Sequence, residues 1–465
     1  MISGVIREYL PALGNAVVDA KANLQTEFAG VSIDSRTNKS GNIFVCIAGE
    51  KFDGHDFARD AAKAGSPVIV VAKARHSEFA NIANAVVIAV DDTLDALQQL
   101  ARHYLEIINP RKVAITGTNG KTTTKAMVAN LLALRYRTCS TRGNLNNQFG
   151  VPLSIFEFDR NCEAAVFEFA MSTPGEIKRL VELYTPDIRV ILNIGPAHLE
   201  TMKTIDAIAE AKFEMLQNYR SDDWVVLNMD DPNIRSRSYR YKVKKVTFGT
   251  SPENDIHPDE VRMNGAGRAH LIYQGDDITM PVMGMHHVSN CLAALAVAKI
   301  MEIPYAQVKG GIESFVPTGN RMTTEEYQGV TIINDAYNSN PVSAKGALDT
   351  IASMKTDGRR IVVFGDMLEL GAKAEEYHAE LGKKIAAART DMLVLLGAFS
   401  EVVKDSATKA GMDSGKIIVA KDHSEAVEVL VHYLRAGDLV LLKASRGIKL
   451  ELVEQGIKAM MGRTN

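Results

Sequence analysis

The residues best suited to chemistry lie in one short run, VAITGTNGKTTTKAMVANLL at 113–132. A β-branched segment leads to Gly117 and Gly120, which permit a tight turn and a close approach of the backbone to an anion. A helical segment follows at once, and the free N–H groups and dipole of such a helix point at a bound anion. Lys121 offers a positive charge for nucleotide phosphates, and Thr122 offers a hydroxyl for Mg²⁺. The run therefore predicts a phosphate-binding loop.

The spacing of this loop differs from that of the common P-loop. The pattern G-x-x-x-x-G-K-[ST] requires a glycine at position 115, where the chain has Ile115. The alternative is a glycine-rich turn without a ligand, but a strand before the loop and a helix after it favour nucleotide binding. The predicted ATP-binding residues of the loop are Gly117, Thr118, Asn119, Gly120, Lys121, Thr122 and Thr123.

Two further groups are predicted to lie beside this loop. Glu168 ends one predicted strand, and His198 comes just past the end of another. In an open α/β sheet, ligands bind outside the carboxyl ends of the strands. Thr122, Glu168 and His198 therefore form a candidate site for hydrated Mg²⁺ held against ATP oxygens. The alternatives are a solvated strand end for Glu168 and a structural histidine for His198.

The elements that position these residues fall into three blocks. A chain of 465 residues predicts about three domains, which we place at 1–109, 110–318 and 319–465. The first boundary lies in a linker at 108–112, because Pro110 cannot continue a helix. Strands alternate with helices in the second and third blocks, which predicts an α/β fold with mostly parallel, doubly wound sheets. Helices are expected over 54–65, 122–136 and 204–219, and strands over 66–72, 84–90, 112–116, 164–170, 189–195, 359–367, 391–398, 415–420 and 437–445.

Composition excludes several classes of protein. The net charge of −3 does not favour non-specific binding to nucleic acid or to anionic membranes. The four cysteines form no C-x-x-C pair, so neither a zinc site nor a disulfide framework is predicted. The first residues do not form a secretory signal, and no run of 18 apolar residues without charges predicts a membrane span. We expect a cytoplasmic protein without stable membrane insertion.

Several motifs resemble those of the Mur ligase family, the ATP-dependent amino-acid and peptide ligases of peptidoglycan synthesis. The shortened loop TGTNGKTTT is the first of them, and the others follow in the family's order over nearly the whole chain. They are GNLNNQFGVPLS at 143–154, FEFAMSTPGEI at 167–177, NIGPAHLE at 193–200, AEAKFEML at 209–216 and GMHHVSNCLAALAVA at 284–298. The resemblance implies a small α/β UDP-sugar-binding domain, a central P-loop ATPase-like domain with a mostly parallel sheet, and a C-terminal Rossmann-like domain.

The resemblance also gives Lys212 a role that its own surroundings do not indicate. Between Glu210 and Glu214, Lys212 fits a solvated helix face with charge pairs along it. In the family the equivalent lysine is usually carbamylated, which turns a cation into a carboxylate-like Mg²⁺ ligand. The resemblance therefore implies that Lys121, His198 and Lys212 are catalytic, and that Asn290 contacts the nucleotide.

The two ends of the chain resemble one branch of the family. The segment 31–57 resembles the UDP-sugar-binding domain of members that add the third residue or the terminal dipeptide. The segments 333–348, 363–371 and 441–451 resemble members that add D-alanyl-D-alanine, and the chain lacks the D-N-P-R segment of diaminopimelate-adding members. By resemblance, Arg321 and Asp335 face the nucleotide. The implied substrate-binding residues are Ser35, Arg36, Gly49, Asp53, His55, Asn338, Asn340, Lys443 and Ser445.

The implied reaction is ATP-dependent formation of an amide between UDP-N-acetylmuramoyl-tripeptide and D-alanyl-D-alanine, through an acyl phosphate, by a monomer. The alternatives are a sibling ligase that adds a single amino acid and an inactive scaffold with the same fold; a folylpolyglutamate synthetase has no use for the N-terminal block. Three positions depart from the family pattern. Ser172 and His287 stand where asparagine is expected, and Ala444 replaces a glycine.

Overall fold

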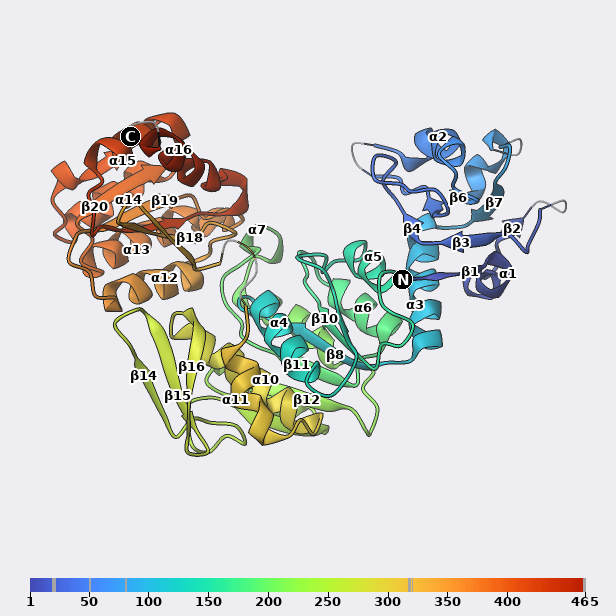
Figure 1. Ribbon diagram of the computed structural model, residues 1–465, viewed down its shortest axis with the longest axis horizontal. Coiled ribbons are helices and arrows are strands. Elements are labelled where there is room, and N and C mark those ends of the chain that lie inside the picture. The colour runs from blue at the N-terminus through green and yellow to red at the C-terminus, as the bar shows by residue number, and fades with distance from the viewer. Residues whose placement is uncertain (19–21, 50–51, 80–81, 317–318, 320, 463–465) are drawn as a thin grey trace.

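The computed structural model describes residues 1–18, 22–49, 52–79, 82–316, 319 and 321–462. The described chain forms an open arc (Figure 1). The N-terminal part lies at one end, the C-terminal part at the other, and the central part joins them. The α/β class is confirmed, with a largely parallel sheet in each of the three parts.

The central sheet has six parallel strands in the order β13-β12-β11-β8-β10-β9. Strands β8, β10 and β11 are buried along most of their length, as expected for a parallel sheet covered on both faces. The strands are β8 (Arg111–Thr116), β9 (Thr138–Ser140), β10 (Ala164–Glu168), β11 (Ile188–Ile191), β12 (Trp224–Asn228) and β13 (Lys244–Phe248). The helices are α4 (Lys121–Leu132), α5 (Gly150–Ile155), α6 (Glu176–Tyr184), α7 (Leu199–Met202), α8 (Ile205–Phe213), α9 (Pro232–Arg235), α10 (His286–Ile300) and α11 (Tyr305–Glu313).

Two helices are shorter than predicted. The helix expected over 122–136 ends at Leu132, and the amides of Leu134 and Arg135 then bond back over three residues in a tighter turn. The helix expected over 204–219 ends at Phe213 and continues only as a single 3-10 turn, η4 (Glu214–Leu216). Arg189 explains why α8 ends early. Its guanidinium donates to backbone carbonyls of the segment 215–218, which therefore does not continue the helix.

Arg189 and Asp223 form a fully buried ion pair, 3.0 Å apart, beneath η4. Asp223 also accepts hydrogen bonds from the backbone and side chain of Arg220. Removing one partner of a buried pair leaves the other charge uncompensated. We therefore expect Asp223→Ala to lower the free energy of unfolding by about 3–5 kcal/mol, measured by urea denaturation. A change near zero would show that water replaces the carboxylate at this position.

A three-stranded antiparallel sheet was not predicted. It consists of β14 (Glu260–Met263), β15 (Arg268–Tyr273) and β16 (Asp276–Met283), with β15 in the middle. Gln274 and Gly275 connect β15 to β16 and both have positive φ, as a type I′ hairpin turn requires. This sheet packs against α10 and α11.

The C-terminal part is a second doubly wound sheet, as predicted, in the order β17-β18-β22-β19-β20-β21. Only the edge strand β17 is antiparallel. Its strands are β17 (Thr323–Tyr327), β18 (Val330–Asp335), β19 (Arg360–Gly365), β20 (Met392–Leu396), β21 (Ile417–Val419) and β22 (Leu439–Lys443). Its α-helices are α12 (Pro341–Ser353), α13 (Ala374–Ala387), α14 (Ser400–Lys409), α15 (His423–Tyr433) and α16 (Glu451–Met461).

The N-terminal part has a five-stranded sheet in the order β2-β7-β6-β5-β4 and a separate antiparallel pair, β1 with β3. The predicted helix over 54–65 is a 3-10 turn, η2 (Gly54–Phe57), followed by α2. The strands are β1 (Ser3–Val5), β2 (Val17–Val18), β3 (Glu27–Ala29), β4 (Val31–Ser32), β5 (Ile43–Val45), β6 (Val68–Ala72) and β7 (Val86–Val90), and the α-helices are α1 (Ile6–Tyr9), α2 (Ala58–Lys63) and α3 (Thr93–Ile108).

The long helix α3 connects the N-terminal and central parts. It ends at Ile108, Asn109 takes a left-handed conformation, and β8 begins after Pro110, which agrees with the predicted linker at 108–112. The boundaries 1–109, 110–318 and 319–465 stay predictions. Residues 317, 318 and 320, beside the second boundary, lie outside the described residues.

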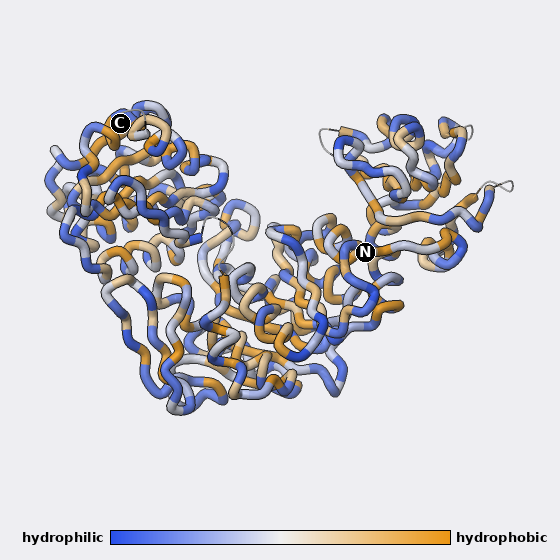
Figure 2. Tube along the Cα trace, in the orientation of Figure 1, coloured by the Kyte–Doolittle hydropathy of each residue, from blue (hydrophilic) through white to orange (hydrophobic). Residues whose placement is uncertain are grey.

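Apolar residues gather inside each part, and polar residues lie mainly on the outside (Figure 2). Within the ranges that the structure describes, no helix has the length and hydropathy to cross a membrane.

Candidate active site

A cleft of about 470 Å³ lies where the carboxyl edge of the central sheet faces the C-terminal part. Most of the predicted site residues of these two parts line it. They are Thr118, Asn119, Gly120, Lys121, Thr122, Thr123, Glu168, His198, Asn290, Arg321, Asp335, Asn338, Asn340, Lys443 and Ser445. Gly117 and Lys212 lie outside this lining, as do the five predicted residues of the N-terminal part.

The phosphate loop connects β8 to α4 and is held by Asn193, which follows β11. The backbone N–H of Thr118 donates to Asn193 O, and that of Asn119 donates to Asn193 Oδ1. Gly120 has a φ of 83°, and a Cβ there would collide with the side-chain amide of Asn290. A Cβ on Gly117 would lie 2.9 Å from the Cβ of Leu192. Both glycines of the motif are therefore required by the conformation of the loop.

Gly120→Ala is expected to raise the KM for ATP about tenfold, because a left-handed backbone with a Cβ is strained and the methyl group displaces Asn290. Gly411→Ala is the matched control, since Gly411 also has a positive φ but no atom within 4 Å of an added Cβ. Steady-state kinetics of the two variants checks this. An equal KM for both would contradict the role of the Gly120 turn.

Lys121 lies folded over the phosphate loop. Its Nζ donates to the carbonyls of Gly117 and Thr118, at 2.9 and 3.1 Å. Burial lowers the pKa of Lys121, and the nearby carboxylate of Glu168 opposes this change. Its partners are neutral carbonyls, so the amine can exchange them for phosphate oxygens without breaking an ion pair.

Glu168, at the end of β10, faces the first turn of α4. Its Oε2 accepts from Thr122 Oγ1 at 2.7 Å, and its Oε1 accepts from Asn146 Nδ2 at 2.8 Å. Lys125 Nζ lies 3.6 Å from the same carboxylate, which is 2% exposed. The alternative of a solvated strand end is therefore wrong. Asn146 was not predicted as a site residue, although it lies in the motif at 143–154, because its contact depends on how that loop folds back.

His198 has a left-handed backbone, with a φ of 54°, and its imidazole faces the C-terminal part. The distance from its Nδ1 to Oε2 of Glu369 is 2.6 Å. This hydrogen bond lowers the pKa of Glu369. The contact joins two of the segments that resemble the family, 193–200 and 363–371. Glu369 itself was not predicted as a site residue.

Lys212 is buried on α8, with 3% of its surface exposed, so the alternative of a solvated helix face is wrong. Its ammonium has no hydrogen-bond or ion-pair partner in the described part of the chain. Burial, and secondly the charge of Lys121, hold its pKa well below the usual range. The flanking acids do not neutralise it, because Glu210 pairs with Arg237 and Glu214 accepts from the amides of Gly175 and Lys178.

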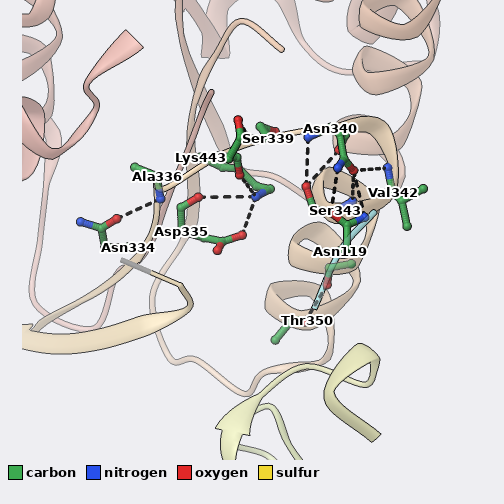
Figure 3. Close-up of polar contacts among 12 residues, drawn as sticks. Asn119, Asn334, Asp335, Ala336, Ser339, Asn340, Val342, Ser343, Thr350 and Lys443 are labelled. Carbon is green, nitrogen blue, oxygen red and sulfur yellow. Dashed lines mark hydrogen bonds and ion pairs between the residues drawn. The ribbon is translucent and has the colours of Figure 1, made fainter. Parts of the chain in front are cut away.

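The C-terminal part contributes a braced turn after β18 to the cleft (Figure 3). Lys443 Nζ lies 2.6 Å from Asp335 Oδ2 and donates to Asn338 O. Ser445 Oγ accepts from the amide of Leu368 and donates to Ser339 O. Lys443 and Ser445 therefore fix the shape of the segment 335–340.

The start of α10 forms the wall beside Gly120. His287 lies 95% buried there, with its Nδ1 3.0 Å from Asn290 Nδ2 and its Nε2 without a partner in the described chain. Burial holds the pKa of His287 well below the usual range. His287, the second departure from the family pattern, thus keeps a neutral imidazole at the cleft.

Arg321 also lines the cleft, and its guanidinium stacks on the ring of Tyr337, 4.1 Å from the ring centroid.

The other two departures have local explanations. Ser172 lines the cleft, its amide donates to Glu176 Oε2, and its carbonyl accepts from Thr201. Ala444 is fully buried in the core of the C-terminal part, and its methyl group packs on Gly365.

The predicted sugar-binding residues lie in the N-terminal part, and three of them are engaged with one another or with neighbours. Arg36 pairs with Asp34 on the surface. Asp53 accepts from the backbone and lies 2.6 Å from Nδ1 of His55, whose Nε2 accepts from the amide of Ala72. The roles of these residues, and of Ser35 and Gly49, in binding a substrate stay predictions.

Models of three Mur ligase domains match the chain. The Mur ligase family catalytic domain matches residues 27–105, the Mur ligase middle domain 115–298, and the Mur ligase glutamate ligase domain 320–446. The chain therefore belongs to the Mur ligase family, which confirms the resemblance, and it is an ATP-dependent ligase of that family.

Three similar proteins carry the names of one branch of the family. A UDP-N-acetylmuramoyl-tripeptide–D-alanyl-D-alanine ligase of Bacillus subtilis is 35% identical over 92% of each chain. A crystal structure of MurF from Acinetobacter baumannii matches with a TM-score of 0.89 and 26% identity over 99% of each chain. A structure of MurF ligase from Thermotoga maritima in complex with ADP matches with a TM-score of 0.82 and 27% identity, over 94% of this chain and 98% of that one.

Proposed function

We propose that this chain joins D-alanyl-D-alanine to UDP-N-acetylmuramoyl-tripeptide at the expense of ATP, as a cytoplasmic monomer in peptidoglycan precursor synthesis. The observation that carries the proposal is the single cleft in which the phosphate loop, Glu168 and the braced turn 335–340 meet. The similarity to ligases of this name extends over nearly the full length of the chain.

The first step activates a carboxylate. An oxygen of the tripeptide's terminal carboxylate attacks the γ-phosphorus of ATP, ADP leaves, and an acyl phosphate forms. Lys121 is placed to move from its loop carbonyls to the transferring phosphoryl group and to neutralise its developing charge.

The second step forms the amide. The free amine of D-alanyl-D-alanine attacks the acyl carbon, the nitrogen loses a proton, and phosphate leaves. The turn 335–340 and residues Lys443 and Ser445 would hold the acceptor dipeptide. Closure of the central and C-terminal parts would exclude the water that otherwise hydrolyses the acyl phosphate.

The donor set fits Mg²⁺, a cation that prefers oxygen ligands. Thr122 Oγ1 and Glu168 Oε2 are 2.7 Å apart at the carboxyl edge of the sheet, where they would hold the cation with ATP oxygens. His198, which lines the same cleft, would also contribute to the metal site. When bound, Mg²⁺ supplies charge stabilisation for the phosphoryl group.

We further propose that Lys212 is carbamylated, so that it serves as a further side-chain ligand of the metal site. Three properties support this: the amine is buried, it lacks a partner among the described residues, and its lowered pKa favours the neutral form that reacts with CO₂. Its nitrogen attacks the carbon of CO₂ and loses a proton, which gives a carbamate. The product replaces repulsion by Lys121 with attraction.

The UDP end of the donor substrate would bind the N-terminal part through Ser35, Arg36, Gly49, Asp53 and His55. Arginine suits a diphosphate because its donors form a rigid fork.

The test is phosphate release from ATP and Mg²⁺, with UDP-N-acetylmuramoyl-tripeptide and D-alanyl-D-alanine added singly and together. Release that requires both substrates, with a UDP-muramoyl pentapeptide as the product, is expected. Release only with a single amino acid in place of the dipeptide would assign the chain to a sibling ligase. No release with any acceptor would favour the inactive scaffold.

A further inference from the structure

Three asparagine side chains connect the central sheet to the C-terminal part through the phosphate loop. The side-chain amide of Asn193 binds the backbone of Asn119 twice, since Oδ1 accepts from Asn119 N at 2.8 Å and Nδ2 donates to Asn119 O at 3.1 Å. Asn119 is thus fixed by its backbone, and its side chain is free to make other contacts.

The side chain of Asn119 pairs with that of Asn340 in the same two-point manner (Figure 3). Asn340 Nδ2 donates to Asn119 Oδ1 at 2.7 Å, and Asn119 Nδ2 donates to Asn340 Oδ1 at 3.2 Å. The two residues are 221 positions apart in the sequence, so this amide pair directly joins the loop that cradles ATP phosphates to the acceptor side of the cleft.

Asn340 is itself held rigidly. It is the N-cap of α12, where its Oδ1 accepts from the amides of Val342 and Ser343, and Ser343 Oγ accepts from its backbone N–H in a capping box. The first turn of α12 also packs closely on the loop after β11, because a Cβ on Gly195 would lie 3.1 Å from Val342 Cγ2. Both members of the amide pair are therefore held in place by their own part of the chain. The pair fixes the position of the turn before α12 relative to the phosphate loop.

We propose that the Asn119–Asn340 pair is an interdomain latch. It holds the acceptor site over the phosphate loop after the acyl phosphate has formed and until the amine attacks it. Both are positioning residues in this role. The inference rests on the proposed function, because it assigns the latch to the second of the two steps. Without the latch, water attacks the acyl phosphate, and the carboxylate and phosphate are released without an amide.

The test measures the ratio of phosphate released to pentapeptide formed. Asn340→Ser keeps a good N-cap and adds no charge but removes the amide, and Asn119→Ala removes the partner. We expect the ratio to rise about thirtyfold in each variant, the factor that corresponds to the loss of the two neutral hydrogen bonds of the pair. The double variant should equal Asn119→Ala alone, because the two residues act through each other.

The matched control is Asp422→Ser, which exchanges the N-cap of α15 in the same part of the chain, away from the cleft. Its ratio should equal that of the wild type. Ratios that stay at the wild-type value in Asn340→Ser and Asn119→Ala, even with a lower rate, would overturn the latch and assign the pair a structural role. Failure of the wild type to form the pentapeptide would instead overturn the proposed function.

Discussion

Lys121→Ala is expected to lower kcat by about three orders of magnitude while the fold persists. In the structure the ammonium contacts only two carbonyls of its own loop, and the cleft gives water access to those carbonyls after truncation. The stability cost is therefore small. The catalytic cost is large, because the charge acts where negative charge moves during phosphoryl transfer.

The measurement is the steady-state rate of amide formation, with circular dichroism and thermal melting to confirm that the variant is folded. Lys345→Ala, which removes an exposed lysine paired with Asp349 on α12, is the control and should keep the wild-type rate. A variant at position 121 that raises only the KM for ATP, with kcat unchanged, would show uniform binding and contradict a role in the transition state.

The phosphate loop and Glu168 could be predicted from the sequence because local order decides their position. Strands of a parallel sheet end at the same edge, so a strand-to-helix turn and an acidic strand end must lie there together. The structure agrees, with Thr122 and Glu168 in direct contact.

The contacts across the cleft could not be predicted in the same way. His198 with Glu369 and Asn119 with Asn340 depend on how two separate sheets are placed against each other, which no local pattern specifies. The antiparallel sheet β14–β16 was missed for a different reason. Its strand β14 is largely exposed and carries charged residues, so the apolar signal of a strand is weak there.

Lys212 shows why burial is harder to predict than secondary structure. Its neighbours Glu210 and Glu214 give the helix a polar pattern that is typical of a solvent-facing surface. In the structure both acids are used by other elements, Glu210 by Arg237 and Glu214 by the N-terminus of α6, and the lysine between them points inward. The polar pattern therefore did not reveal that Lys212 is buried.

Lys212→Ala is expected to abolish most of the activity, by about 100-fold or more, if the carbamate is a ligand of the metal site. Short carboxylic acids such as acetate should restore part of the rate, because a free carboxylate can occupy the space of the lost side chain. Lys121→Ala is the matched control, since it also removes a lysine amine of the central part, and acetate should not restore it. Removal of bicarbonate and CO₂ should lower the rate of the wild type and leave Lys212→Ala unchanged. Mass spectrometry cannot replace this test, because carbamates lose CO₂ on acidification. A Lys212→Ala variant without acetate rescue, together with a wild type indifferent to CO₂, would leave Lys212 as a neutral buried amine and exclude it from the metal site.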